Sequence, residues 1–301
     1  MKVLITGATG LVGKQLVQLL LSKGVSVNYL TTSKGKIQDK QHYRGFYWNP
    51  EKDVIDEKCL DGADCIIHLA GASISKRWTK AYKQEILDSR IQSANVLYRM
   101  LKTHPHNVVQ FITASAIGIY PDSLGDVYYE DDARVDDSFL GEVVQKWEAA
   151  AKQIEQRGIK VAILRTGIVL SGEGGALVEM ARPVRLGVGS AFGSGKQMQS
   201  WIHIDDLVDI YQHVYINGLE GVYNAVAPNP VTNDTLMHAI AGVLGKPYFM
   251  PKVPKFAMAA ILGEMHMLLF SSQNVSANKI LDTGFKFKYL SLKTALEEAL
   301  K

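Results

Sequence analysis

The first thirty residues contain the feature that most constrains the fold, a glycine-rich turn between an apolar run and an amphipathic helix. Residues 2–5 (KVLI) are a short apolar run, the kind that is buried on both faces of a parallel sheet. The turn at 6–13 (TGATGLVG) leads into a helical apolar pattern that ends at Gly24, and a second strand follows at 26–32. Strand, turn, helix and strand in this order predict a right-handed βαβ unit.

The three glycines of this turn have the spacing of a dinucleotide-binding fingerprint. Gly7 permits the tight turn, Gly10 lets the backbone approach a pyrophosphate, and Gly13 lets the helix pack close to the strand. The helix N-terminus then offers free N–H groups and the positive end of its dipole to phosphates. An ordinary turn is the alternative, which the complete βαβ context disfavours. The cofactor contacts expected in this turn are those of Gly7, Thr9, Gly10, Leu11, Val12 and Gly13.

The end of the second strand bears on which dinucleotide binds. NAD sites usually place Asp or Glu there to bind the ribose 2′-hydroxyl, and that carboxylate would repel a 2′-phosphate. Here the strand ends in Thr31, Thr32 and Ser33, with Lys34 and Lys36 close behind. Hydroxyls and cations without an acid favour NADP(H) over NAD(H). The alternative, that both lysines are only solvated loop charges, stays open.

Strands and helices continue to alternate along the chain. Strands are expected at 63–71, 108–116 and 160–171, and helices at about 80–102 and 138–156. This alternation predicts an α/β fold with a doubly wound parallel (Rossmann) sheet, which binds its ligand at the carboxyl ends of the strands. The residues expected at those ends are Leu69, Ala70, Gly71, Ala114 and Ser115.

Composition and charge argue against several other classes of protein. The formal net charge is only +3, and Lys and Arg are scattered, so no nucleic-acid partner is expected. Cys59 and Cys65 are expected to be buried apolar residues, not a disulfide framework or part of a metal site. The apolar stretch 256–270 contains Glu264 and is too short to span a bilayer, so it is expected to be a core or pocket-lining helix.

The N-terminus turns into glycine after five residues and therefore lacks the apolar segment of a signal peptide. A cytoplasmic protein without a membrane partner is expected.

Several motifs together resemble the extended or atypical short-chain dehydrogenases/reductases. They are TGATGLVG, HLAGASI, TASAIGIY, LRTGIVLS and SWIHIDDLV. The segments at 77–90, 192–206, 224–233 and 284–287 are further similar to the NAD(P)-dependent sugar-nucleotide epimerase branch that includes the bacterial YfcH protein. The resemblance runs nearly end to end. It implies a dinucleotide-binding domain at 1–167, to which about 200–225 returns. It also implies a smaller C-terminal substrate lobe formed by 168–199 and 226–301.

The resemblance also indicates what the helix at about 138–156 lacks. In that superfamily this helix carries a Tyr and a Lys four residues apart, which share a face and move the proton during hydride transfer. Anchoring the comparison on Glu148 places these two positions at Leu140 and Val144, neither of which can transfer a proton. The comparison puts Ser89 where the superfamily often has a structural asparagine. Of the catalytic set only Ser115 remains.

Other proton donors are therefore needed as candidates. Tyr120, a few residues after Ser115, is taken as the second catalytic candidate, although Tyr120 and Pro121 could equally be a packing and turn pair. His203 is expected to order a strand end, as lone histidines in apolar strands usually do. Tyr82, Lys83 and Lys146 are the remaining candidates, and Lys146 is expected to be a solvated helix charge.

The resemblance implies three further cofactor contacts. Glu85 could accept a hydrogen bond from a ribose hydroxyl, and Arg90 could donate to ribose or phosphate. Ile168 would contact the nicotinamide side. The alternative for the charged segment 77–90 is a solvated surface face.

Two functions are consistent with these features. The first is an NADP(H)-dependent epimerase or reductase that acts on a nucleotide sugar or a small carbonyl substrate. The second is an NADP(H)-binding sensor or assembly partner with little or no catalysis, motivated by the missing Tyr–Lys pair. The identity of the small-molecule substrate and the oligomeric state are not predicted.

Overall fold

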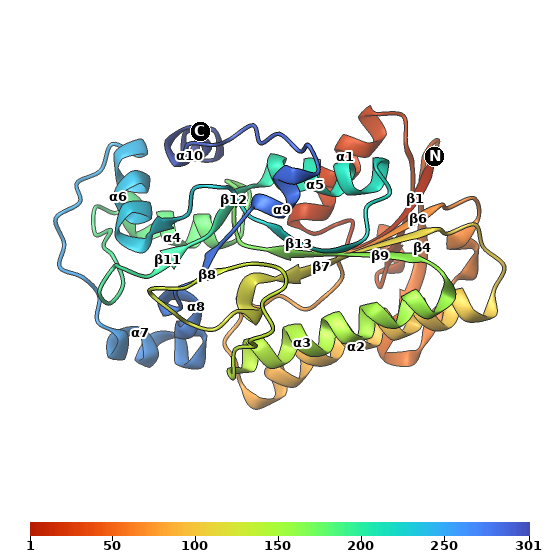
Figure 1. Ribbon diagram of the computed structural model, residues 1–301, viewed down its shortest axis with the longest axis horizontal. Coiled ribbons are helices and arrows are strands. Elements are labelled where there is room, and N and C mark those ends of the chain that lie inside the picture. Colours follow the sequence, from red (N-terminus) through yellow and green to blue (C-terminus); the bar gives the residue numbers. More distant parts are fainter.

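The computed structural model describes all 301 residues, and its centre is a nine-stranded sheet between two layers of helices (Figure 1). The strands of this sheet are β1 (Lys2–Thr6), β2 (Ser26–Thr31), β3 (Asp39–Lys40), β4 (Tyr43–Asn49), β5 (Val54–Ile55), β6 (Cys65–His68), β7 (Gln110–Ala116), β9 (Lys160–Thr166) and β13 (Gly221–Ala225). Their spatial order is β13-β9-β7-β6-β1-β2-β4-β3, with β5 beside β4. All pairs from β13 to β4 are parallel, and only β3 and β5 run antiparallel to their neighbour.

Helices cover both faces of this sheet, which confirms the predicted doubly wound fold. The helices are α1 (Leu11–Ser22), α5 (Ile204–Ile216) and α9 (Asn278–Asp282) on one face, and α2 (Lys80–Thr103) and α3 (Phe139–Lys152) on the other (Figure 1). Leu16 of α1 and Tyr211 of α5 belong to the buried cluster on the first face. Leu97 and Met100 of α2 belong to the cluster on the second face. Cys59 and Cys65 are buried and unbridged, as predicted.

The stretch 160–171, predicted as one strand, is two strands in different sheets, so that prediction was wrong. After β9 the chain leaves the main sheet at Gly167 and continues as β10 (Ile168–Leu170), which pairs with β12 (Trp201–His203). A Cβ at Gly167 would lie 2.3 Å from the carbonyl oxygen of Ser200, so only glycine permits this approach.

A second lobe is built around β10 and β12 from later parts of the chain. Its helices are α4 (Ala176–Arg185), α6 (Asn233–Val243) and α10 (Leu292–Leu300). Trp201, Leu177, Leu236 and Leu296 form the centre of its own buried cluster. Its short strands are β11 (Met198–Gln199), which pairs with β14 (Val231–Thr232), and β15 (Asn274–Val275), which pairs with β8 (Val127–Tyr128).

The prediction of a core or pocket-lining helix at 256–270 was also wrong. The segment forms α7 (Lys255–Leu262), a 3-10 turn (Gly263–His266) and the short helix α8 (Met267–Phe270), and none of their residues is buried. Gly263 has a φ of +60°, which ends α7. Phe256 and Ile261 of α7 therefore lie on the outside of the second lobe, whereas Met258 is half-buried against its cluster.

Candidate cofactor and active site

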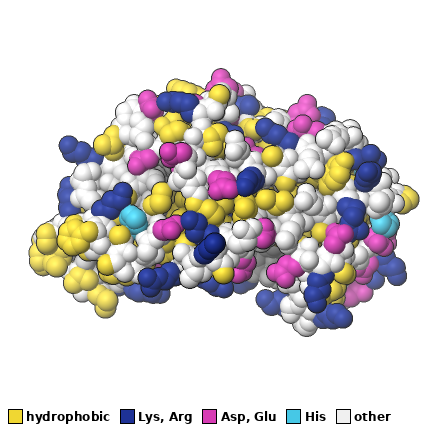
Figure 2. Space-filling model, turned by 90° about the horizontal axis from the view of Figure 1, so that it is seen from below, with side chains coloured by type: hydrophobic (Ala, Val, Ile, Leu, Met, Phe, Trp, Pro, Cys, Tyr) yellow, Lys and Arg dark blue, Asp and Glu magenta, His cyan; other side chains and the backbone are white.

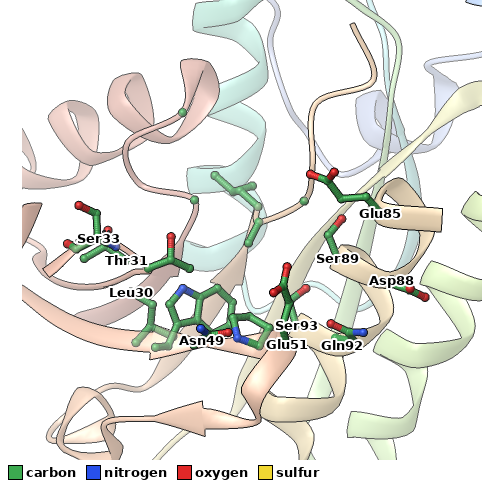
Figure 3. A pocket seen from close by; sticks show the side chains of 18 of the residues that line it. Leu30, Thr31, Ser33, Asn49, Glu51, Glu85, Asp88, Ser89, Gln92 and Ser93 are labelled. Carbon is green, nitrogen blue, oxygen red and sulfur yellow. Dashed lines mark hydrogen bonds between the residues drawn. The ribbon is translucent and has the colours of Figure 1, made fainter. Parts of the chain in front are cut away.

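A cavity of about 770 Å³ opens at the carboxyl ends of β1, β2, β4 and β6 (Figure 3). Its wall contains ten of the residues predicted to bind the cofactor, contributed by the glycine-rich turn, the end of β2, the loop after β6 and the start of α2. They are Gly7, Thr9, Gly10, Thr31, Thr32, Ser33, Leu69, Ala70, Gly71 and Glu85. The structure thus brings together residues that are far apart in the sequence.

The glycine-rich turn has the geometry that a diphosphate requires. Gly7 has a φ of +71°, and a Cβ there would lie 2.9 Å from the backbone carbon of Leu69. A Cβ at Gly13 would lie 2.2 Å from the carbonyl oxygen of Gly7, so α1 packs directly on the turn. No side chain caps α1 at Gly10, and its first amides have no intrahelical acceptor. The open N-terminus therefore fits an anionic ligand.

The end of β2 forms one side of the cavity, and this side contains no acidic residue. Thr31 Oγ1 accepts a hydrogen bond of 3.2 Å from the Ser33 amide, which fixes this turn. Lys36 lines the cavity, whereas the Lys34 ammonium lies over the Tyr47 ring, 5.2 Å from its centroid. The acids of the wall, Glu51, Glu85 and Asp88, come from β4–β5 and from α2 instead (Figure 3). A phosphate beside Thr31 and Ser33 would meet hydroxyls and a cation.

Two hydroxyl groups fix the loop after β6 in the cavity wall. Thr6 Oγ1 accepts from the amides of Leu69 and Ala70 at 3.1 and 3.0 Å. Ser89 Oγ accepts from the Ala72 amide at 2.9 Å. Ser89 therefore ties the loop to α2, a structural role like the one that the family resemblance implies for this position.

Sequence reasoning missed part of the cavity wall. The missed residues are Leu30, Trp48, Asn49, Pro50, Glu51, Ala81, Gln84, Asp88, Gln92 and Ser93, together with Ser89 and Lys36, which were not assigned to the cofactor. Those on α2, apart from Gln84, lie three, four, seven or eight residues from Glu85, so the helical period could have identified them. Those on β4 gave no such signal, because this strand was not predicted.

The remaining predicted cofactor residues do not line the cavity. They are Leu11, Val12, Gly13, Arg90, Ala114 and Ile168. Arg90 lies behind the loop, where Nη1 donates to the carbonyl oxygens of Ala72 and Ile86 at 3.2 and 2.9 Å. Its guanidinium lies 5.0 Å from the Trp147 ring centroid, and burial lowers its pKa to about 10. Arg90 thus braces the loop, and its contact with a cofactor stays a prediction.

Ser115 belongs to a buried polar network between β7, α3 and β9. Its hydroxyl donates to Glu148 Oε1 at 2.7 Å, and Arg165 donates to both oxygens of the same carboxylate at 2.9 Å. Burial acts to lower the pKa of Arg165, but the hydrogen bond and charge of Glu148 raise it above its ordinary value. The single hydroxyl proton of Ser115 is used in the hydrogen bond to Glu148. The Ser115 oxygen can therefore act toward a ligand only as a hydrogen-bond acceptor.

Tyr120 extends this network and is itself almost fully buried. Its hydroxyl donates to Asn224 Oδ1 at 2.7 Å and accepts from Arg165 Nη1 at 2.9 Å. Its ring stacks on Tyr128 with the centroids 5.1 Å apart. Burial raises the pKa of Tyr120 to about 12. This placement favours the packing alternative for Tyr120, and its catalytic role stays a prediction.

Leu140 and Val144, which occupy the positions of the missing Tyr–Lys pair, also have apolar surroundings. Val144 is buried against the sheet, and Leu140 packs in a cluster with Trp78 and Phe139. Met265 and Leu268, which follow α7, also pack against this cluster. Neither a hydroxyl nor an ammonium from α3 replaces the pair here.

The other proton-donor candidates have partners of their own. His203 Nδ1 accepts from the Asp205 amide at 3.2 Å and so caps α5, in line with the predicted ordering role. Lys146 pairs with Glu142 on the exposed side of α3 at 2.6 Å. Lys83 pairs with Glu264 at 2.6 Å, and the Tyr82 hydroxyl donates to the Ser73 carbonyl.

His68, at the end of β6, makes stability depend on pH. Its ring bonds Ser93 Oγ at 2.9 Å and Thr113 Oγ1 at 3.2 Å, and burial, then the charge of Arg90, lowers its pKa to about 3. The unfolded chain takes up this proton near pH 6.5, so stability is complete above that pH. It should fall by about 1.4 kcal/mol per pH unit from there toward pH 3.

His68→Gln should lose this component of the acid sensitivity in urea unfolding measured between pH 7.5 and pH 5, whereas replacing the exposed His238 should not. An unchanged pH dependence in His68→Gln would contradict the assignment.

The fold and the cavity define a Rossmann-type nucleotide-binding protein of the short-chain dehydrogenase/reductase kind. More narrowly, residues 3–225 match the NAD dependent epimerase/dehydratase family, and the chain belongs to that family. Residues 253–299 match a domain of unknown function, DUF1731.

Two relatives match over nearly the whole chain. An epimerase family protein of Staphylococcus aureus is 39% identical over 299 residues, 99% of this chain and 98% of its own length. One of Staphylococcus epidermidis is 38% identical over 301 residues, with the same coverage of both chains.

Solved structures share the fold over the whole chain. Human epimerase family protein SDR39U1, solved with NADPH, has a TM-score of 0.86 at 29% identity and is covered over 99% of its length. A nucleoside-diphosphate sugar epimerase of Corynebacterium glutamicum has a TM-score of 0.80 at 30% identity, and this chain covers 58% of it. A UDP-glucuronic acid 4-epimerase of Bacillus cereus, solved with UDP-glucuronic acid and NAD, has a TM-score of 0.80 at 18% identity over 98% of its length, a likeness of fold alone.

Proposed function

We propose that the protein binds NADP(H) in the cavity at the glycine-rich turn and acts as an epimerase or reductase on a nucleotide sugar or a small carbonyl compound. One observation carries the proposal. The open N-terminus of α1 and the acid-free rim of Thr31, Thr32, Ser33 and Lys36 line the same cavity. The NADPH in the structure of human SDR39U1 supports this choice of cofactor.

In this proposal each part of the wall has a distinct task. The first amides of α1 hold the diphosphate, and Thr31, Ser33 and Lys36 hold the 2′-phosphate. Glu85 accepts from a ribose hydroxyl. When bound, the nicotinamide ring supplies a hydride acceptor or donor. Ser115 orients a substrate hydroxyl or an amide by accepting its proton in a hydrogen bond, because its own proton points to Glu148.

Cofactor preference is the first test. NADPH should raise the thermal midpoint more than NADH does, because a ligand that binds only the folded state stabilises it. Lys36→Ala should remove most of the difference, and Lys23→Ala, at the far end of α1, should leave it unchanged. A thermal-shift titration with both nucleotides measures this. Equal shifts in the unchanged protein would contradict the role of the β2 rim.

A second function is favoured by the network around Ser115. The Ser115 hydroxyl already donates its hydrogen bond to Glu148, Tyr120 is buried, and Leu140 and Val144 are apolar. These features suit a protein that binds NADP(H) as a sensor or assembly partner. Binding needs only backbone donors and shape, whereas reduction needs a proton source within hydrogen-bond reach.

Turnover separates the two functions. If the protein is an enzyme, a panel of nucleotide sugars and carbonyl compounds should give steady turnover that Ser115→Ala lowers by about 100-fold, the scale of a lost contact that orients the substrate. Tyr120→Phe tests the second candidate, with the exposed Tyr129→Phe as its control. Such turnover would exclude the sensor, and its absence across the panel with NADPH binding intact would favour it.

A further inference from the structure

An exposed apolar surface lies at the end of the second lobe, on the segment 244–263 that includes α7. Figure 2 shows hydrophobic side chains gathered at the left end of the molecule, where Figure 1 places α7. Phe249, Phe256 and Ile261 are exposed over 75%, 77% and 67% of their surface. An isolated exposed apolar residue is ordinary, but several large ones on one segment mark an interaction surface. We call this segment the α7 surface.

Basic residues predominate along the α7 surface, and Glu264, the exposed acid directly after it, pairs with Lys83 at 2.6 Å. Segment 244–263 contains Lys246, Lys252 and Lys255, all exposed, and no acidic residue. The neighbouring segment 73–83 also lacks acids and adds exposed basic residues. Its Arg77 reaches the end of α7, with Nε 3.8 Å from where a Cβ of Gly263 would be. The whole chain has a net charge of only +3, whereas segment 244–263 alone contributes three positive charges and no negative one.

We propose that the α7 surface docks on an anionic lipid bilayer. Phe249, Phe256 and Ile261 would enter the headgroup region, and the lysines beside them would face the lipid phosphates. This is contact with one face of a membrane, and no helix has the length and apolar character to cross one. A second copy of the chain suits the surface less well, because a twofold contact centred on α7 would bring like charges together.

The proposal is tested by co-sedimentation of the full chain with lipid vesicles. Binding is expected to vesicles that combine phosphatidylglycerol with phosphatidylcholine, to weaken as salt is raised, and to be much weaker with phosphatidylcholine alone. The variant with Phe256→Ser and Ile261→Ser should lose at least about tenfold in binding to the anionic vesicles. Val109→Ser is the matched control. Val109 is 64% exposed and directly precedes β7 of the main sheet, outside the second lobe.

Two measurements keep the result interpretable. The thermal midpoint and its shift with NADPH should be the same in both variants and the unchanged protein, which shows that all are folded. Sedimentation velocity without lipid gives the oligomeric state. The proposal is overturned if the unchanged protein binds no vesicles or binds both kinds equally. It is also overturned if the Phe256 and Ile261 changes dissociate an oligomer.

Discussion

Replacing Glu148 with alanine is expected to lower the free energy of unfolding by about 3–5 kcal/mol, the cost of leaving a buried charge unpaired. Glu148 and Arg165 are both nearly inaccessible to solvent, and the carboxylate accepts two hydrogen bonds from the guanidinium and one from Ser115. The variant leaves Arg165 charged and without its counter-ion. Urea unfolding followed by circular dichroism measures the change.

A matched variant separates burial from charge. Glu142 lies on the same helix and pairs with Lys146, but that pair is exposed to solvent, so Glu142→Ala should leave the free energy of unfolding almost unchanged. Combining Glu148→Ala with Arg165→Met should recover much of the loss, because no buried charge then remains. If Glu148→Ala costs no more than Glu142→Ala, the network does not stabilise the fold as described.

Replacing Gly13 with alanine is expected to weaken NADPH binding by at least about 100-fold, because a shift of α1 removes several contacts with the diphosphate at once. The added Cβ would lie 2.2 Å from the carbonyl oxygen of Gly7 and 2.8 Å from the Cα of Ala8. Both neighbours are backbone atoms, so α1 must move away from the turn. The amides at its N-terminus then no longer converge on the diphosphate. Isothermal titration with NADPH measures the loss.

Gly242→Ala is the control for this change. Gly242 lies in α6 with nothing within 4 Å of the added Cβ, so the variant should bind NADPH normally. It should also be more stable by about 0.5–1 kcal/mol, as expected for Gly to Ala within a helix. Full affinity in Gly13→Ala would show that the ligand does not rest on the first turn of α1.

The sequence predicted the nucleotide-binding half of the molecule well because its signals are local. Gly7, Gly10 and Gly13 follow a strand directly. Gly7 and Gly10 line the cavity, and α1 packs on the turn at Gly13, as their spacing predicts. The strand at β4 was missed, although Phe46 and Trp48 alternate as buried residues, because Gly45 directly before them weakens the pattern. Because β4 was not predicted, Asn49 and Glu51 at its end were not assigned to the site.

The active-site region was less predictable because its partners are distant in sequence. Glu148 was recognised on α3, but nothing local to it indicates Arg165, which β9 carries to the same place. The environment of Tyr120 likewise depends on Asn224 in β13. The exposure of α7 was unexpected because an apolar composition does not distinguish a core helix from an uncovered one.

The departure of the chain from the main sheet at Gly167 has a consequence for how such proteins can diversify. The chain enters the second lobe at β10, returns through α5 to β13, and leaves again after Ala225. Neither half is therefore a contiguous stretch that recombination could exchange as a cassette. An exchange of the second lobe would have to replace two separate segments, one before α5 and one after β13.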